Sequence, residues 1–151
     1  MALDQTAKIY NVQKSFRKYL IDNVNRIGGV RVSFDKDITP PQKQGVPYDS
    51  WLSVNYGTSL PETVSMQMVR LACCTRKDKE ADDLAQMRDT VMGYLTDTDT
   101  GYQRIPLYDV STWTAVGSML VYIDAESGVQ EATDGTKFKL INLTLKWGSK
   151  V

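Results

Sequence analysis

Two apolar stripes with helical spacing lie among segments with strand-like alternation, and their order restricts the folds that this chain can adopt. In residues 4–27, apolar side chains recur every three or four positions, which predicts an amphipathic helix with Lys14, Arg17 and Lys18 on its other faces. Residues 78–95 repeat this pattern. The first stripe consists of Ile9, Val12, Phe16, Leu20, Val24 and Ile27, and the second of Ala81, Leu84, Met87, Val91, Tyr94 and Leu95.

The ends of these helices carry recognisable signals. Asp4 is the expected N-cap of the first helix, and Gly28 with Gly29 supplies a left-handed stop after it. Asp78 and Glu80 favour the positive end of the second helix dipole. We therefore expect two separate helices in this chain.

Six segments show the pattern of β-strands. They are residues 30–34, 51–56, 64–74, 104–110, 119–123 and 137–147. Pro106 lacks a backbone N–H, so its strand is expected at a sheet edge. Phe138 and Leu140 are out of phase with the apolar residues after them, which predicts a bulge or twist near Leu140. Residues 71–74 are continuously apolar, which indicates burial on both faces or a partner at the exposed face.

Turn-forming residues separate these elements. Residues 35–50 contain Pro40, Pro41, Gly45 and Pro47, and we expect a long exposed loop without a regular ladder there. Further turns are expected at 57–61 and 96–101, and a polar hairpin loop at 124–135. This order predicts an α+β fold of one domain, residues 1–151: an antiparallel or mixed β-sheet with two helices packed on one face. Oligomerisation would cover the face of the sheet that has no helices.

Composition excludes several kinds of activity. The chain has 151 residues and no histidine, which removes imidazole catalysis and most zinc and haem sites. Eighteen basic and 18 acidic residues give no net charge, which argues against a dedicated nucleic-acid binder and favours self-association. No secretory signal or membrane-spanning stretch is evident. We expect a non-enzymatic, intracellular protein without a cofactor or metal.

The other chemical candidates have simpler interpretations. Cys73 and Cys74 are adjacent, so a disulfide between them would be strained, and buried core sulfur is the better interpretation. Asp97, Asp99 and Asp109 do not complete a calcium loop, because its remaining positions lack the required residues. The carboxylates before and within the second helix are either solvated partners of its dipole or an acid–base pair. They are Asp78, Glu80, Asp82 and Asp83.

Aromatic and basic residues in the loops are candidates for an interface with other subunits. Trp147 ends an alternating apolar face and is expected in the core, whereas Trp113 lies in STWTAVG and is either an interface anchor or a local cap on the core. Residues 35–50 and 111–117 are the candidate contact loops. The candidate interface residues are Pro40, Pro41, Tyr48, Arg76, Lys77 and Trp113, and Lys36, Lys43 and Lys79 are further cations that an acidic partner could pair with.

Several segments together resemble a known family. They are WLSVNYG, VSMQMVRLACCTR, DKEADDLAQMRDTVMGYL, GSMLVYID and KFKLINLTLKW. In the order of their expected helices and strands and in the residue patterns of the strands, over residues 4–147, they resemble the tail terminator proteins of tailed bacteriophages. Neck, tail-completion and tail-tube subunits have similar size and texture.

The resemblance implies a structural virion protein. Six copies would form a ring that caps the tail tube, ends its polymerisation and forms the junction to the head connector. The implied partners are further copies, the tail tube protein, connector or neck proteins, and the sheath protein of a contractile tail. DNA would pass through the lumen without sequence-specific binding, and no membrane is involved. The implied location is the tail or neck of the virion, after assembly in the host cytoplasm.

Three alternatives remain open at this point. The chain could be another neck or tail-tube ring subunit. It could be a monomeric module that binds a peptide or strand at an exposed sheet edge. It could also be a small enzyme that uses only carboxylates, for instance Asp78 with Glu80 or Asp82.

Overall fold

The computed structural model describes residues 9–35, 38, 40–60, 64–78, 80–97, 99–100 and 102–148, so the predicted N-cap Asp4 lies outside the described residues. Helix α1 (Ile9–Tyr19) continues as a π-helical segment, η1 (Leu20–Asn25), and α2 spans Asp82–Leu95. The strands are β1 (Val32–Phe34), β2 (Gln42–Lys43), β3 (Val46–Pro47), β4 (Ser50–Leu60), β5 (Val64–Thr75), β6 (Gln103–Asp109), β7 (Thr114–Glu126), β8 (Gln130–Glu131) and β9 (Lys137–Gly148).

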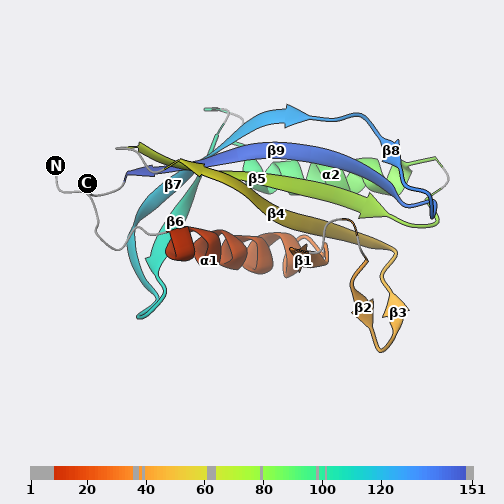
Figure 1. Ribbon diagram of the computed structural model, residues 1–151, viewed down its shortest axis with the longest axis horizontal. Coiled ribbons are helices and arrows are strands. Elements are labelled where there is room, and N and C mark those ends of the chain that lie inside the picture. Colours follow the sequence, from red (N-terminus) through yellow and green to blue (C-terminus); the bar gives the residue numbers. More distant parts are fainter. Residues whose placement is uncertain are drawn as a thin grey trace.

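The described residues form a seven-stranded mixed sheet, and the predicted α+β fold is confirmed. The strand order is β1-β4-β5-β9-β7-β6, and β8 pairs with β9. Strand β1 runs parallel to β4, and the other strand pairs in this sheet are antiparallel. Strand β6 lies at an edge, as its proline predicted. The sheet curls strongly, with α1 and α2 along its length (Figure 1).

Both helices pack on the same face of the sheet. On β5, alternate residues Val69, Leu71 and Cys73 are buried in the large core. Helix α1 with η1 contributes Val12, Phe16, Leu20 and Val24 to this core, and α2 contributes Leu84, Met87, Val91 and Leu95. Trp147 is also buried there, as predicted. The alternate apolar residues of the strands and the apolar stripes of the two helices thus pack together in one layer.

The first helix is widened at its end, which the sequence spacing did not predict. An α-helix turns through about 400° in four residues, so an apolar stripe spaced by four drifts about 40° at each step. The π-helical segment takes more residues per turn and keeps Leu20 and Val24 fully buried. The same shift turns Ile27 outward, where it is 69% exposed. Its predicted place in the apolar stripe is therefore wrong.

Two glycines end this helix for different reasons. Gly29 has a φ of +73°, the left-handed conformation expected of a helix stop. A Cβ on Gly28 would lie 2.8 Å from the Val24 carbonyl oxygen and 3.1–3.2 Å from side-chain atoms of Thr90 and Tyr94. Gly28 therefore allows the end of η1 to approach α2 closely.

The proline-rich segment contains a ladder, contrary to the expectation of an unpaired loop. Gln42 pairs with Pro47 and Lys43 with Val46, across a turn in which Gln44 and Gly45 both have positive φ. Two positive φ values suit a two-residue hairpin turn. Ile38 packs against buried residues of the sheet, and Pro41 is buried, so the segment is not wholly exposed either.

Strand β4 continues where a turn was expected at residues 57–61. It runs to Leu60 and accommodates an irregularity in register between Tyr56 and Ser59. The buried side chain of Gln67 supports this irregularity: its Nε2 donates to the carbonyls of Gly57 and Met68, each at 2.9 Å, and its Oε1 accepts from the Ser59 hydroxyl at 2.7 Å. A side chain from β5 thus satisfies backbone groups that the regular ladder leaves over.

A bulge or twist was expected near Leu140, and of these the bulge is wrong. Strand β9 pairs with β5 in unbroken register, and the nearby shift lies in β7, between Ile123 and Ala125. Phe138 and Leu140 are out of phase because they face the side of the sheet without helices. There they pack with Ile38 against a small buried cluster made of Trp51, Ala72 and Cys74. Burial on both faces of residues 71–74 and the buried cysteines are confirmed.

Candidate interaction surface

A groove lies between the outer side of the first helix and the turn that joins β6 to β7. Its volume is about 640 Å³, within the usual size range of binding clefts. It is lined by Lys14, Arg17, Lys18, Ile21, Asp22 and Trp113. We refer to these six residues as the α1 groove. It combines an aromatic wall, one aliphatic side chain, three cations and one acid.

Trp113 supplies the exposed aromatic wall of the groove. Its side chain is 50% exposed and its φ is +52°, a conformation that costs a non-glycine residue about 1–3 kcal/mol. The preceding turn is held by Asp109, whose Oδ1 accepts from the backbone N–H and the hydroxyl of Ser111. The Tyr108 ring lies 6.1 Å from the Trp113 ring. Half of this tryptophan is thus available to a partner, and its role as an interface anchor stays a prediction.

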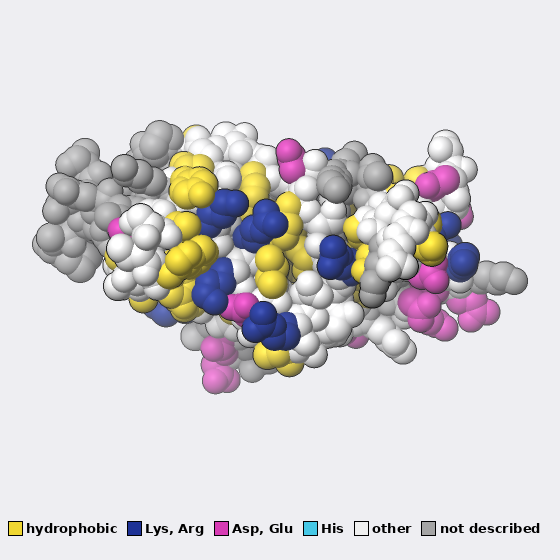
Figure 2. Space-filling model, turned by 90° about the horizontal axis from the view of Figure 1, so that it is seen from below, with side chains coloured by type: hydrophobic (Ala, Val, Ile, Leu, Met, Phe, Trp, Pro, Cys, Tyr) yellow, Lys and Arg dark blue, Asp and Glu magenta, His cyan; other side chains and the backbone are white. Residues whose placement is uncertain are grey.

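The three cations of the groove are each held in position. Lys18 pairs with Asp22 at 2.5 Å and also lies over the Tyr108 ring. The Arg17 guanidinium lies 4.4 Å from the centre of the Phe34 ring, and the Lys14 ammonium lies 5.7 Å from that of Tyr10. Figure 2, which looks at the molecule from this side, shows Lys and Arg side chains alternating with hydrophobic ones. The arrangement suits a partner that brings carboxylates and some apolar surface.

Helix α1 also closes the edge of the sheet at β6. The N–H of Tyr108 donates to the Ser15 hydroxyl at 2.9 Å, and that of Val110 donates to Asn11 Oδ1 at 3.2 Å. The N–H of Arg104 bonds to the Gln103 side chain, and Pro106 has no N–H to offer. Alternate donors along this edge are therefore used or missing, which disfavours addition of a strand from another molecule.

The other five predicted interface residues belong to the segment of the β2–β3 hairpin and to the chain after β5, which lie at the opposite end of the molecule from the turn between β6 and β7 (Figure 1). Arg76 and Lys77 reach Asp49 at 3.7 and 3.9 Å, and the Tyr48 N–H donates to the Pro41 carbonyl. Pro41 is buried and Pro40 is half-buried. The contacts of Pro41, Tyr48, Arg76 and Lys77 hold residues 41–49 against their own sheet. Lys36 and Lys79 lie outside the described residues, as does the side chain of Lys43.

The carboxylates at the start of the second helix divide into two kinds. Asp78 is buried, and its Oδ2 accepts from the Leu84 N–H at 3.0 Å and the Thr75 hydroxyl at 3.1 Å, so it satisfies donors at the start of α2. Helix α2 itself begins at Asp82 rather than at 78. Glu80, Asp82 and Asp83 are exposed. The Asp78 carboxylate is thus bound by groups of its own fold.

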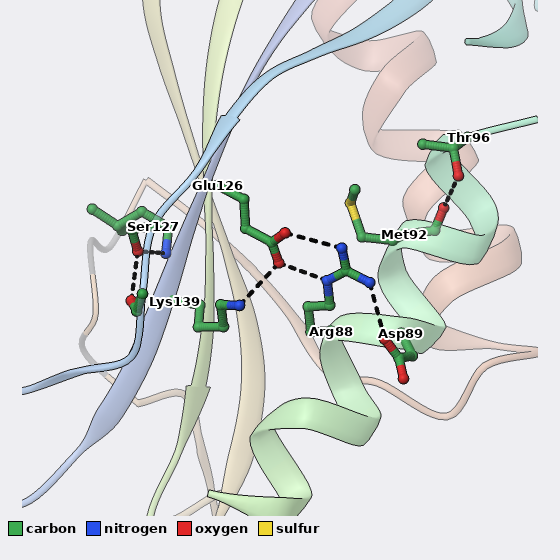
Figure 3. A network of polar contacts seen from close by, with 9 residues as sticks. Arg88, Asp89, Met92, Thr96, Glu126, Ser127 and Lys139 are labelled. Atoms are coloured by element: carbon green, nitrogen blue, oxygen red, sulfur yellow. Dashed lines mark hydrogen bonds and ion pairs between the residues drawn. The ribbon is translucent and has the colours of Figure 1, made fainter. Parts of the chain in front are cut away.

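An ion-pair network that the sequence did not reveal fixes α2 to the sheet. Arg88 binds Glu126 through two hydrogen bonds of 2.6 and 2.9 Å, and Lys139 reaches the same carboxylate at 3.1 Å (Figure 3). These donors, Arg88 first, lower the pKa of Glu126 to about 2. The three residues come from α2, β7 and β9, so only the folded chain brings them together.

Two further observations concern the described residues only. They contain no group of three or more His, Cys, Asp or Glu residues that could hold a metal ion. None of their helices combines the length and the apolar character that crossing a bilayer requires.

Comparison with known proteins adds evidence about the fold. No protein-family model matches this sequence, and no curated protein is significantly similar to it. Several solved structures match, and one of them has a TM-score of 0.58 and 10% sequence identity, over 93% of this chain and 95% of that chain. The name of that protein describes no function. At this identity the likeness shows a shared α+β fold alone.

The lining of the groove was only partly predictable. Trp113 was a candidate from its loop, but Lys14, Arg17 and Lys18 were interpreted as solvated decoration of the helix. In addition, residues 111–117 are not one loop, because β7 begins at Thr114. The available signal was a helix face with three cations and one acid, which becomes meaningful only when a distant tryptophan lies beside it.

Proposed function

We propose that this chain is a structural subunit of a ring that ends the tail tube of a tailed bacteriophage. Six copies would cap the tube, stop its polymerisation and present a junction to the head connector. The order of elements over residues 4–147 suggests this family. The observation that carries the proposal is the strained, half-exposed Trp113 of the α1 groove, because an exposed aromatic side chain beside cations suits contact with another subunit.

The outward N–H groups of β6 are already bonded or missing. This supports association of subunits through side-chain surfaces rather than by pairing of strands from two subunits. A ring needs two different patches on each subunit, and their relative orientation fixes how many copies close it. Strand addition at β6 is disfavoured by Ser15, Asn11 and Pro106. Helix α1 and the β6–β7 turn are joined by hydrogen bonds, so the groove is preorganised, which lowers the entropic cost of docking.

A cap of this kind works by geometry without a chemical step. Binding to the last tube ring would cover the surface that the next tube ring needs. The opposite side of the new ring would differ from a tube ring, so that it accepts the connector. The proposed partners are therefore copies of this chain, the tube protein, connector or neck proteins, and the sheath protein where the tail contracts.

Negative-stain imaging of the purified protein over a range of concentrations tests this proposal. Six-fold rings with an open centre are the expected result. Long helical tubes would assign the chain to the tail tube and contradict the capping role. Small particles without symmetry at every concentration would contradict a self-assembling ring and favour a monomeric binding module.

A further inference from the structure

We propose that the α1 groove binds the acidic start of helix α2 from a second copy of this chain. The inference rests on the proposed function, since a ring requires two different and complementary patches on each subunit. It adds which two surfaces meet.

The two helices carry opposite charge. From Ile9 to Asn25 the first helix contains three bases, Lys14, Arg17 and Lys18, and one acid, Asp22. Helix α2 contains three acids, Asp82, Asp83 and Asp89, and one base, Arg88. Arg88 is held by Glu126 and Asp89, which leaves α2 with an acidic outer surface. The net charge of zero therefore conceals two patches of opposite sign.

Both patches are accessible in the single chain. Asp82 and Asp83 are exposed, and so is Glu80 just before the helix. They stand at the first turn of α2, while Asp78 binds the backbone donors of that turn from the buried side. The two helices lie along different parts of the curled sheet (Figure 1). The proposed contact joins two different patches, and where it repeats in one direction it is head-to-tail, the kind that closes into rings.

A protein partner explains the groove better than nucleic acid does. Asp22 stands among the cations and is paired with Lys18, so Lys14 and Arg17 are the cations that remain for an anionic partner. Non-specific nucleic-acid binding depends on many phosphate contacts, whereas this groove offers three cations, one of them already held by a carboxylate. An acidic helix end that buries Trp113 and pairs with Lys14 and Arg17 uses the aromatic wall and two of the three cations of the groove.

Paired charge reversals test the contact by sedimentation velocity of the full chain. One variant carries Lys14→Glu and Arg17→Glu, and the other carries Asp82→Lys and Asp83→Lys. Each is expected to weaken self-association by at least about tenfold, because like charges then face each other. In a one-to-one mixture the acidic groove of the first variant meets the basic helix of the second. The unchanged basic groove of the second variant meets the unchanged acidic helix of the first. The mixture is therefore expected to regain wild-type association.

Matched controls separate this contact from a general charge effect. Arg104→Glu on the helix-free face and Glu131→Lys on β8 alter exposed charges elsewhere, and we expect both to associate like the wild type. Circular dichroism verifies that every variant is folded.

Several outcomes would overturn the docking mode. They are a wild type that stays monomeric, reversals without effect, or a mixture that does not recover. If mixed-sequence duplex DNA binds the wild type and the Lys14→Glu, Arg17→Glu variant releases it, without self-association, the groove belongs to nucleic acid. Rings that persist in both reversals would reject this contact and keep the ring proposal. Tubes that both reversals dissolve would keep the contact and reject the capping role.

Discussion

The two faces of the sheet differ in how completely their side chains are buried and hydrogen-bonded. On the helix-covered face, buried polar side chains have partners: Gln67 binds backbone groups at the β4 irregularity, and Asp78 binds the start of α2. On the helix-free face a much smaller cluster surrounds Trp51. Its Nε1 is the one buried side-chain nitrogen or oxygen among the described residues without a hydrogen-bond partner. Met68, on the same face, is 44% exposed.

This difference suggests that the two faces contribute unequally to the stability of the fold. An unsatisfied buried donor costs about 1–3 kcal/mol, and a small cluster returns little apolar burial to offset it. The helix-covered face therefore fixes the fold, and the helix-free face opens more easily. The adjacent residues Cys73 and Cys74 point to opposite faces and sample both environments.

The largest expected difference comes from the same substitution made on each face. Phe16→Ala removes a fully buried ring from the helix-covered core and is expected to cost about 3–5 kcal/mol. Phe138→Ala removes a half-buried ring from the other face and is expected to cost about 1–2 kcal/mol. Urea unfolding of both variants measures the two losses. Equal losses would contradict the contrast between the faces.

Gln67→Met tests whether polar satisfaction stabilises the helix-covered face. Methionine has a similar shape but cannot donate to the carbonyls of Gly57 and Met68 or accept from Ser59. The expected loss is about 2–3 kcal/mol, the cost of leaving buried groups unpaired. Gln86→Met on exposed α2 is the matched control and is expected to stay within about 0.5 kcal/mol. A loss as small as the control's would refute the role of Gln67.

The two cysteines allow the opening of each face to be measured separately. In the closed protein, burial raises the pKa of Cys73 to about 12, so its thiol reacts only after opening. Cys73→Ala leaves Cys74 as the reporter of the helix-free face, and Cys74→Ala leaves Cys73 as the reporter of the helix-covered face. Iodoacetamide is expected to label Cys74 at least about tenfold faster, an opening easier by about 1.4 kcal/mol.

Unfolding curves of both cysteine variants must be compared first, because a difference in global stability would also change labelling. With matched stabilities, equal labelling rates would mean that the two faces open together.

The smallest expected effect concerns the ion pairs at the rim of the helix-covered face. The pKa of Glu126 lies at about 2 instead of 4.5, so its contribution is complete above about pH 4.5 and is lost as the pH falls through about 2. Glu126→Gln is expected to cost about 1 kcal/mol at neutral pH, after allowance for partial exposure and solvent screening. The gap to the wild type should narrow across that acidic window in urea unfolding. Glu131→Gln is the control, and a gap independent of pH would refute the pairing.

Much of the fold was predictable because burial follows local periodicity. The stripe through Val12, Phe16 and Leu20 predicted the first helix, and alternation in β5 and β9 predicted the central strands. The widening at η1 was missed, although its signal was the four-residue spacing of the apolar stripe, and the close approach of Gly28 to α2 is set by the fold. Phe138 and Leu140 gave a real signal that was misinterpreted: they face the other side of the sheet, where Ile38 from a distant segment covers them.

The candidate site was predictable only in its tryptophan. The cations of α1 lie about a hundred residues before Trp113, and no local pattern connects them. The connection depends on Asn11 and Ser15, which dock the helix onto the β6 end. Most polar residues on a helix are exposed to solvent, so nothing in the sequence distinguished Asn11 and Ser15 as residues that bind the β6 end.

The docking of α1 against β6 also determines how this protein would fail under stress. The helix occupies the N–H groups of Tyr108 and Val110. If α1 detaches while the sheet persists, both donors become available together at an unprotected edge, which is the geometry that seeds fibrillar aggregation. Aggregation under mild destabilisation should therefore follow the release of one helix and begin before the sheet itself is lost.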